Sequence, residues 1–315
     1  MNNTKKKSPI SWVPTAYFAM GLPFVVLNMV TVLMFKGLEV DDKLITFWTS
    51  LILLPWTLKP LWSPFLELFR TKKFFVIVTQ LITGVTFGLV AFALNLSHFF
   101  SISIALLAIV AFSGATHDIA CDGVYMSELS NEDQAKFIGW QGAFYNIAKI
   151  LATGGLVYLA GYFIELNADA GLLTANKRAW MIILLILSVT MILLGIYHLF
   201  ALPSTQSASS RKTLRSNKEV MKELGQVLMD FFRKTHITYY ICFIILYRFA
   251  EGFVMKIVPL FLKADREMGG LGLNEKEIGL YYGTYGAAAF VLGSLLAGYY
   301  IAPVSYTHLT LPTIL

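Results

Sequence analysis

The chain has 315 residues, of which 57% are hydrophobic and 14% are charged, and its formal net charge is +6. Because a soluble domain carries about 25% charged residues, this composition excludes a soluble globular protein and indicates an integral membrane protein. The net positive charge does not indicate a nucleic-acid partner, since most basic residues fall in particular loops, and Cys121 and Cys242 form neither a disulfide framework nor a zinc-finger spacing.

Long apolar stretches predict the elements of the fold. A spanning helix needs about 20 mostly apolar residues. Glycine and proline recur inside these stretches, as membrane helices allow. In chain order, the stretches that qualify are 12–35, 44–66, 74–94, 99–122, 137–164, 179–201, 237–262 and 277–301. We therefore expect an all-α membrane protein with eight transmembrane helices.

The distribution of lysine and arginine predicts the orientation. A cytoplasmic N-terminus, which carries Lys5, Lys6 and Lys7, places about twice as many basic loop residues inside as outside. The sequence also predicts four regions. Residues 1–201 form an N-terminal six-helix bundle, 202–236 a basic cytoplasmic linker, and 237–302 the first two helices of a C-terminal bundle. Residues 303–315 change composition abruptly and are interpreted as an artefactual tail, the alternative being a genuine short tail.

The linker contains apolar residues at helical spacing among charges, from Val220 to Phe231. This pattern predicts either an amphipathic helix lying on the membrane surface or a soluble helix that bridges the two bundles. Two bundles joined by such a linker are typical of transporters built from structural repeats.

The second stretch contains a charge among helix breakers. Lys59 lies between Pro55, Pro60 and Pro64, which predicts a broken helix with freed backbone carbonyls. Lys59 lies about two turns from the cytoplasmic end, at the depth expected for Asp118 in the fourth stretch. An ion pair between the two is one interpretation, and snorkelling of Lys59 to the headgroups is the other.

The fourth stretch ends in His117, Asp118, Cys121 and Asp122. An ionised carboxylate in hydrocarbon costs at least ~2.5 kcal/mol, so Asp118 and Asp122 are predicted to face a wet cavity or a partner and to act in proton coupling or gating. His117 is a packed helix residue or a proton carrier. Four potential ligands within six residues of one helix cannot converge on one ion, so no metal site is predicted.

Two further stretches carry polar side chains. Gln141, Tyr145 and Lys149 recur every four residues, which predicts either a substrate-facing wall or a helix–helix hydrogen-bond seam. Arg248 lies near the middle of the seventh stretch, three residues before Glu251. Such a charge needs a partner there, so the two form either a structural ion pair, or a gate or a clamp for an anionic substrate.

Three motifs together resemble the AmpG-type muropeptide permeases of the major facilitator superfamily, a wider family that includes acetyl-CoA transporters. Residues 54–64, LPWTLKPLWSP, resemble the family's LPYTLKFLWAP, 115–122, ATHDIACD, resemble ATQDIAxD, and 246–251, LYRFAE, resemble LYKLGD. The resemblance runs in order over residues 12–301. It implies twelve helices, an inner-membrane location and proton-coupled import of disaccharide-peptides. The departures are His117 for Gln, Gly123 for Ala, and Glu67 and Glu251 for Asp.

These observations predict a secondary active transporter that imports muropeptides or related amino-sugar or oligosaccharide solutes with protons. The alternatives are a transporter of acetyl-CoA or another anionic solute, and a membrane sensor that transports nothing. No nucleophile–base or metal constellation favours an enzyme, and no cofactor is expected. The partners expected are a small solute, protons and the lipid bilayer, around a monomer. The predicted solute-binding residues are Lys59, Trp56 (stacking on a sugar), Gln141, Tyr145, Lys149 and Arg248.

Overall fold

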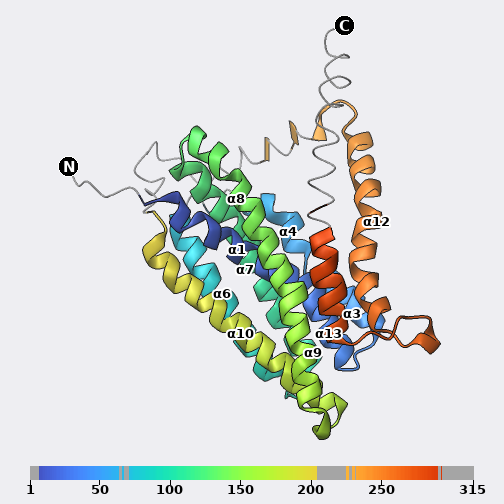
Figure 1. The fold of residues 1–315 in the computed structure, drawn as a ribbon. Coiled ribbons are helices and arrows are strands. Elements are labelled where there is room, and N and C mark those ends of the chain that lie inside the picture. Colours follow the sequence, from blue (N-terminus) through green and yellow to red (C-terminus); the bar gives the residue numbers. More distant parts are fainter. Residues whose placement is uncertain are drawn as a thin grey trace.

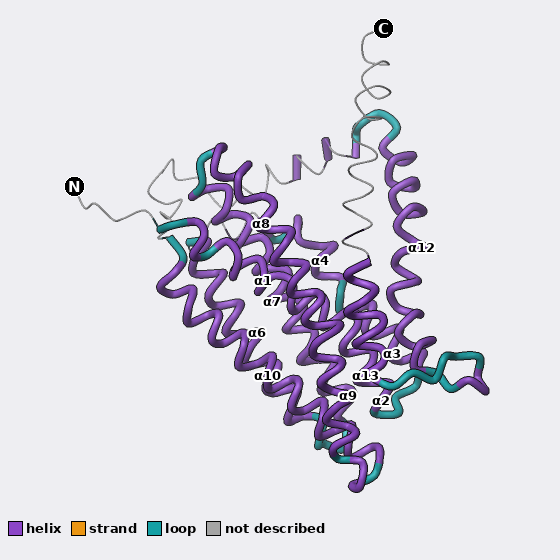
Figure 2. Tube along the Cα trace, viewed as in Figure 1, coloured by secondary structure: helices purple, strands orange, loops and turns teal. Residues whose placement is uncertain are grey.

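The computed structural model describes residues 7–63, 66, 71–203, 225–226, 229–230, 232–289 and 292. Every regular element in this described part is helical (Figure 2). Six helices are long and apolar enough to cross a membrane, and they correspond to the first six predicted stretches. The all-α membrane fold is therefore confirmed. Most of the predicted linker helix, and all of the 303–315 tail, lie outside the described residues.

The first span is the central helix of the bundle. It begins with η1 (Pro9–Ser11) and continues through α1 (Val13–Val25), the π-helical η2 (Val26–Val30) and α2 (Thr31–Gly37). Its most apolar window is 89% buried, the largest share among the six spans. Such a helix, apolar on all sides, is suited to a position surrounded by other helices.

The second span is broken where the prolines predict. It consists of α3 (Asp42–Leu51), α4 (Leu54–Leu58) and the 3₁₀ turn η3 (Lys59–Leu61). The Asp41 side chain caps the start of α3 by accepting hydrogen bonds from the backbone N–H groups of Lys43 and Leu44. Because the helix is interrupted before Lys59, this side chain projects from a short irregular turn rather than from a continuous helix.

The remaining four spans complete the bundle (Figure 1). They are α6 (Lys72–Ala93), α7 (Phe99–Glu128), α8 (Asn131–Ile150) with η4 (Leu151–Leu156) and α9 (Val157–Leu166), and, after η5 (Ala168–Ala170), α10 (Leu172–Ala201). α6 lies against both α7 and α10, while α1 lies against α7 and α8. This order places side chains from α1, α6, α7 and α10 close enough to meet.

The seventh predicted stretch is α12 (Ile237–Lys263), a continuous helix that is not among the six candidate spans. A loop with η7 (Arg266–Met268) leads to α13 (Glu275–Ile278) and the π-helical η8 (Gly279–Gly286), which begin the eighth stretch. α12 lies beside α3 at its C-terminal end and stands apart from the other helices toward its N-terminal end (Figure 1). The two parts of the chain therefore meet at one end of the molecule.

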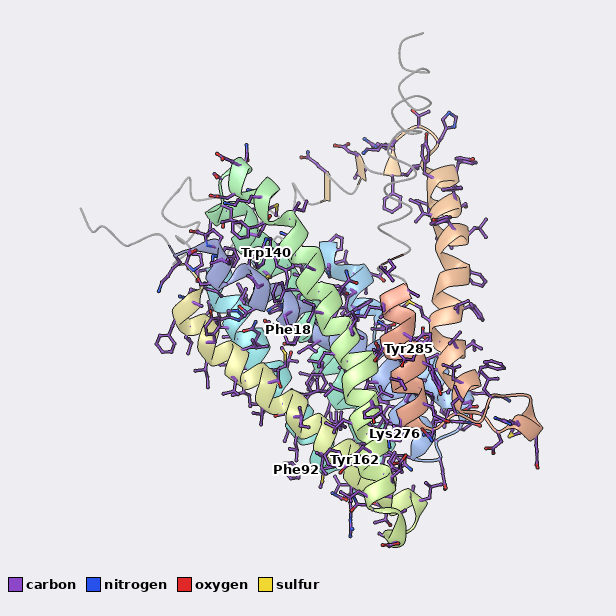
Figure 3. All side chains as sticks on the ribbon, in the orientation of Figure 1. Phe18, Phe92, Trp140, Tyr162, Lys276 and Tyr285 are labelled. Atoms are coloured by element: carbon purple, nitrogen blue, oxygen red, sulfur yellow. The ribbon has the colours of Figure 1, made fainter. Side chains whose placement is uncertain are left out.

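Side-chain exposure follows the pattern of a protein in lipid. Large apolar residues remain exposed along the outer faces of α6, α7, α10 and α12. Aromatic side chains lie toward both ends of the bundle, with Trp140 at one end and Phe92 and Tyr162 at the other (Figure 3). Aromatic residues at the two membrane–water interfaces form the belts that anchor spanning helices.

Glycines allow α8–α9 and α13–η8 to touch at the backbone. A Cβ added at Gly161 would lie 2.4 Å from the backbone nitrogen of Lys276, and one at Gly283 would lie 2.1 Å from the carbonyl oxygen of Thr153. A Cβ at Gly154 would meet the Thr284 hydroxyl at 2.6 Å. Gly154 and Gly161 therefore allow the close approach of these helices.

Candidate functional site

The ion pair expected from matching depths is present. Lys59 Nζ lies 2.6 Å from Asp118 Oδ2, with side-chain exposures of 27% and 12%. The broken second span provides Lys59, and α7 provides Asp118 at a point where its neighbours are buried. The other carboxylate oxygen, Asp118 Oδ1, is buried and has no hydrogen-bond partner among the described residues. One oxygen is thus neutralised, and the second can accept a proton or a donor group.

Trp56 is part of the same cluster. Its indole Nε1–H donates to Asp118 Oδ2 over 2.9 Å. Its ring packs edge-on against Phe24 at 5.3 Å, and a Cβ at Gly114 would lie 2.9 Å from the ring. Glycine at 114 therefore makes room for the indole against α7. The geometry gives Trp56 the role of orienting Asp118, while stacking on a sugar stays a prediction.

Asp122 lies one turn further along α7 in a different environment. Tyr17 of α1 donates its hydroxyl to Asp122 Oδ1 over 2.8 Å. Tyr17 is buried, whereas Asp122 is exposed. The two acids are therefore distinct, because Asp118 is held by a cation within the bundle and Asp122 by a neutral donor nearer the surface.

His117 takes part in a buried polar chain that the sequence did not reveal. His117 Nε2 lies 2.9 Å from Gln80 Nε2, Gln80 Oε1 lies 2.8 Å from His198 Nδ1, and His198 Nε2 lies 2.9 Å from Thr15 Oγ1. Gln80 and His198 are polar residues inside apolar stretches, and this position is the feature of the sequence that indicates a buried polar contact. The missing information was that α6 lies between α7 and α10.

A cavity of about 300 Å³ lies where the six-helix bundle meets α12 and η8. Its polar lining includes Tyr145 and Lys149 from α8, Asn28 from η2 and Tyr282 from η8. Gln141, half-buried one turn earlier on α8, is not among the described residues that line it. The predicted polar stripe is therefore divided, with two of its three members at the cavity.

Lys256 of α12 is buried beside this cavity. Its ammonium lies 3.4 Å from the carbonyl oxygen of Asn28 and 3.3 Å from that of Thr49. Asn28 belongs to the π-helical η2, where the backbone departs from the usual helical hydrogen-bond ladder and can present a carbonyl to another helix. The sequence placed Lys256 in a helix but gave no indication of this contact between the two parts of the chain.

The sequence also makes predictions about a charged pair on α12 and about metal binding. The backbones of Arg248 and Glu251 lie in α12, but their side chains fall outside the described residues. No group of three metal-ligating side chains occurs within the described part of the chain. The described geometry therefore neither tests the Arg248–Glu251 pair nor offers a metal centre.

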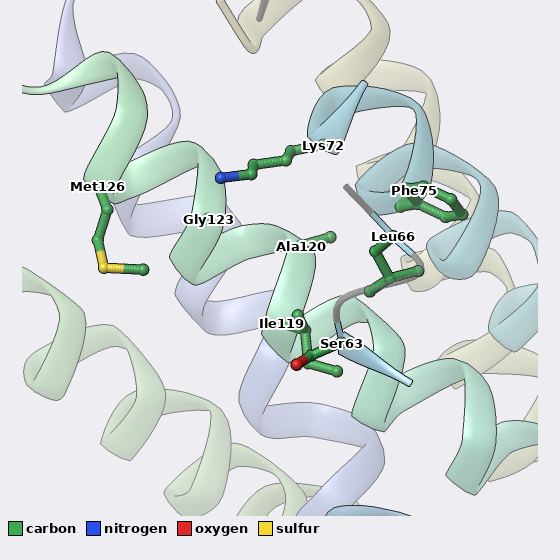
Figure 4. A pocket seen from close by; sticks show the side chains of 8 residues that line it. All are labelled: Ser63, Leu66, Lys72, Phe75, Ile119, Ala120, Gly123 and Met126. Atoms are coloured by element: carbon green, nitrogen blue, oxygen red, sulfur yellow. The ribbon is translucent and has the colours of Figure 1, made fainter. Parts of the chain in front are cut away.

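A second cavity, of about 380 Å³, lies between the end of the second span, α6 and α7 (Figure 4). The Lys72 side chain crosses over Gly123, where an added Cβ would lie 2.7 Å from Lys72 Cδ. This contact gives a physical reason for glycine at a position where the resembled family has alanine. The Lys72 stem packs over α7 one residue beyond Asp122.

Ion pairs lie at the end of the molecule opposite the start of α1, where the six-helix bundle meets α12 and α13. Lys276 of α13 pairs with Glu165 of α9 at 2.9 Å, and Lys263 at the end of α12 pairs with Glu275. The hydrogen bond to Glu165 raises the pKa of Lys276. Burial of α12 is greatest around Lys256 and Leu260, while its first half is largely exposed. The interface between the six-helix bundle and the helices α12 and α13 is therefore closed at this end.

Comparison with known proteins places the chain in a family. The Major Facilitator Superfamily model matches residues 15–314. The anhydromuropeptide permeases of Escherichia coli K12 and O157:H7 are each 24% identical over 289 residues, covering 89% of this chain and 53% of the permease. The chain thus spans about half the length of the curated relatives it matches.

A solved structure agrees at the level of fold. A bacterial homologue of the human lysosomal transporter Spinster, in an inward-facing and unoccupied conformation, matches with a TM-score of 0.66 and 14% identity. The match covers 96% of this chain and 64% of that one. Since the family model covers nearly the whole sequence and the helices follow the same fold, the chain belongs to the Major Facilitator Superfamily.

Proposed function

We propose that the protein is a secondary active transporter that imports muropeptides, or related amino-sugar or oligosaccharide solutes, together with protons. The observation that carries this proposal is Asp118, a buried carboxylate on a spanning helix with one oxygen bound to Lys59 and Trp56 and the other without a partner in the described part of the chain. Ionisable groups in such positions mark substrate or proton pathways.

The ion pair suggests how a proton acts on the helices. A proton on Asp118 removes the charge that Lys59 neutralises, so the attraction between η3 and α7 falls. Lys59 then projects as an unpaired cation from a proline-broken turn, which can move more easily than a continuous helix. Asp122, which accepts a hydrogen bond from Tyr17, is the second acid along the same path toward the surface.

The cavity supports a solute that carries negative charge. Lys149 lines it directly, and Lys256 is bound to the carbonyl of Asn28, another lining residue. Muropeptides carry carboxylates that such cations can bind. The same cationic lining favours a second candidate, a transporter of acetyl-CoA or another anionic solute.

Alternating access gives a role to the contacts between the six-helix bundle and the helices α12 and α13. The contacts of α12 and α13 with α2, α3 and α9 close one end, and the first half of α12 is largely exposed. With the N-terminus in the cytoplasm of a bacterium and the chain in its inner membrane as a monomer, the end that these contacts close faces the outside. This arrangement agrees with the inward-facing conformation that is named for the Spinster homologue.

An uptake screen tests the proposal. Proteoliposomes with an imposed proton gradient, acid outside, are given labelled anhydromuropeptide, a neutral oligosaccharide or acetyl-CoA. Accumulation of the muropeptide above its equilibrium level, abolished by a proton ionophore, supports the proposal. Accumulation of acetyl-CoA alone supports the second candidate. A protein that binds solute but moves none across the membrane is a sensor, and this result contradicts both.

A further inference from the structure

The buried polar chain next to Asp118 joins four helices and is separate from the ion pair. It runs from His117 on α7 through Gln80 on α6 and His198 on α10 to Thr15 on α1. Gln80 and His198 have 0% exposure and His117 has 2%. His117 Nδ1 is buried and has no partner among the described residues. Two histidines therefore face one amide in a site without water contact at its centre.

The chemistry of the amide constrains both imidazoles. One end of the Gln80 side chain only donates hydrogen bonds and the other end only accepts them. The histidine nitrogen that faces the amide nitrogen must therefore lack a proton, and the one that faces the amide oxygen must carry a proton. Of His117 Nε2 and His198 Nδ1, one is protonated and the other is not.

Two complete arrangements satisfy this constraint. In the first, the Gln80 amide nitrogen donates to His117 Nε2, so the His117 proton is on Nδ1, and His198 Nδ1–H donates to the amide oxygen. Thr15 then donates its hydroxyl to His198 Nε2. The neutral imidazoles of His117 and His198 both carry their proton on Nδ1.

The second arrangement follows from turning the amide by half a turn. His117 Nε2–H then donates to the amide oxygen, and the amide nitrogen donates to His198 Nδ1. His198 Nε2–H donates to Thr15, whose hydroxyl donates to the carbonyl oxygen of Trp12 at 3.2 Å. Both imidazoles now carry their proton on Nε2. Every link of the chain is kept, with its direction reversed.

We propose that Gln80 couples His117 and His198 into a linked proton switch, in which the two neutral imidazoles always share one tautomer and the pair holds at most one excess proton. A charged imidazole donates from both nitrogens and needs the amide oxygen, which faces one histidine at a time. Lys59 near His117 and Lys73 near His198 also repel a second positive charge.

The switch links two places in the molecule. His117 Nδ1 is a hydrogen-bond donor in the first arrangement and an acceptor in the second, one residue before Asp118. At the far end, Thr15 changes the direction of its bond at the start of α1. The arrangement adopted beside Asp118 therefore fixes the direction of the hydrogen bond at Thr15, about one turn inside the N-terminal end of the central helix, whichever solute is carried.

Nitrogen-15 NMR of ring-labelled histidine in lipid nanodiscs tests the proposal in the unmodified protein. His98 and His236 are exposed and serve as internal reference signals outside the chain of hydrogen bonds. We expect His117 and His198 to show the same tautomer at alkaline pH and never to be charged together as the pH falls. Opposite tautomers of His117 and His198, or imidazolium signals from both of these residues at one pH, would overturn the switch.

A substitution at the amide gives a second test. In Gln80→Glu the ionised carboxylate accepts from both sides, so His117 carries its proton on Nε2 and His198 on Nδ1, and their tautomers now differ. Gln141→Glu makes the same chemical change on α8 and leaves both tautomers matched. Matched tautomers in Gln80→Glu at alkaline pH would contradict the proposal. Should this variant fail to fold, the unmodified protein still decides the question.

Discussion

The ion pair between Lys59 and Asp118 makes a quantitative prediction about stability. The substitutions Lys59→Met and Asp118→Asn each remove one charge while keeping side-chain size, and the double variant removes both. If the pair stabilises the bundle, each single variant loses the attraction between the two charges and also leaves one charge without its partner. The double variant then recovers part of the loss, because neither charge is left alone.

The distance and exposure set the expected size. Two unit charges 2.6 Å apart attract by about 6 kcal/mol at an effective dielectric of about 20, before desolvation is subtracted. Breaking a fully buried pair costs about 3–5 kcal/mol and an exposed pair about 0.2–1 kcal/mol. Since the Lys59 side chain is 27% exposed and Asp118 only 12%, we expect a coupling energy of about 2 kcal/mol.

The assay is reversible unfolding of the four proteins in mixed detergent micelles, with the coupling energy taken from the double-mutant cycle. Lys36 and Asp42 provide a matched control, since their charges lie 2.8 Å apart but Asp42 is 46% exposed. The same cycle there should give less than about 1 kcal/mol. A coupling energy for Lys59 and Asp118 below about 0.5 kcal/mol, or no larger than the control, would refute the reasoning.

Three further predictions follow from single contacts. Tyr17→Phe removes the hydroxyl that donates to Asp122 and should lower the free energy of unfolding by about 1 kcal/mol, whereas an unchanged value would mean that the bond contributes nothing. Gly161→Leu forces a side chain into the backbone of α13 and should lower the melting temperature, while Gly139→Ala, with open space around its Cβ, should not; equal effects would contradict the close approach. Lys149→Met should weaken binding of an anionic solute at least tenfold in equilibrium titrations, and unchanged affinity would remove it from the site.

Much of the fold was predictable because hydropathy reports directly on lipid contact. The six candidate spans lie where the apolar stretches predict them, and the break in the second span follows from prolines that cannot continue a helix. The Lys59–Asp118 pair was also accessible, since both residues lie at similar depth on helices that run in the same direction. Depth along a membrane is readable from sequence.

Lateral arrangement is not readable in this way. Gln80 meets two histidines only because α6 packs between α7 and α10, and nothing in the three stretches specifies that order. The contact of Lys256 with the carbonyls of Asn28 and Thr49 likewise depends on a π-helical segment in the first span. These features depend on which helices are neighbours and on local departures from regular geometry, neither of which a hydrophobic pattern records.

The central claim, that Asp118 couples solute movement to protons, is tested most directly by uptake in proteoliposomes with Asp118→Asn. Under an inward proton gradient, the unmodified protein should concentrate labelled anhydromuropeptide above its equilibrium level. The variant should only equilibrate the solute across the membrane, because an amide cannot take up and release the proton. Accumulation by the variant to the level of the unmodified protein would contradict the account.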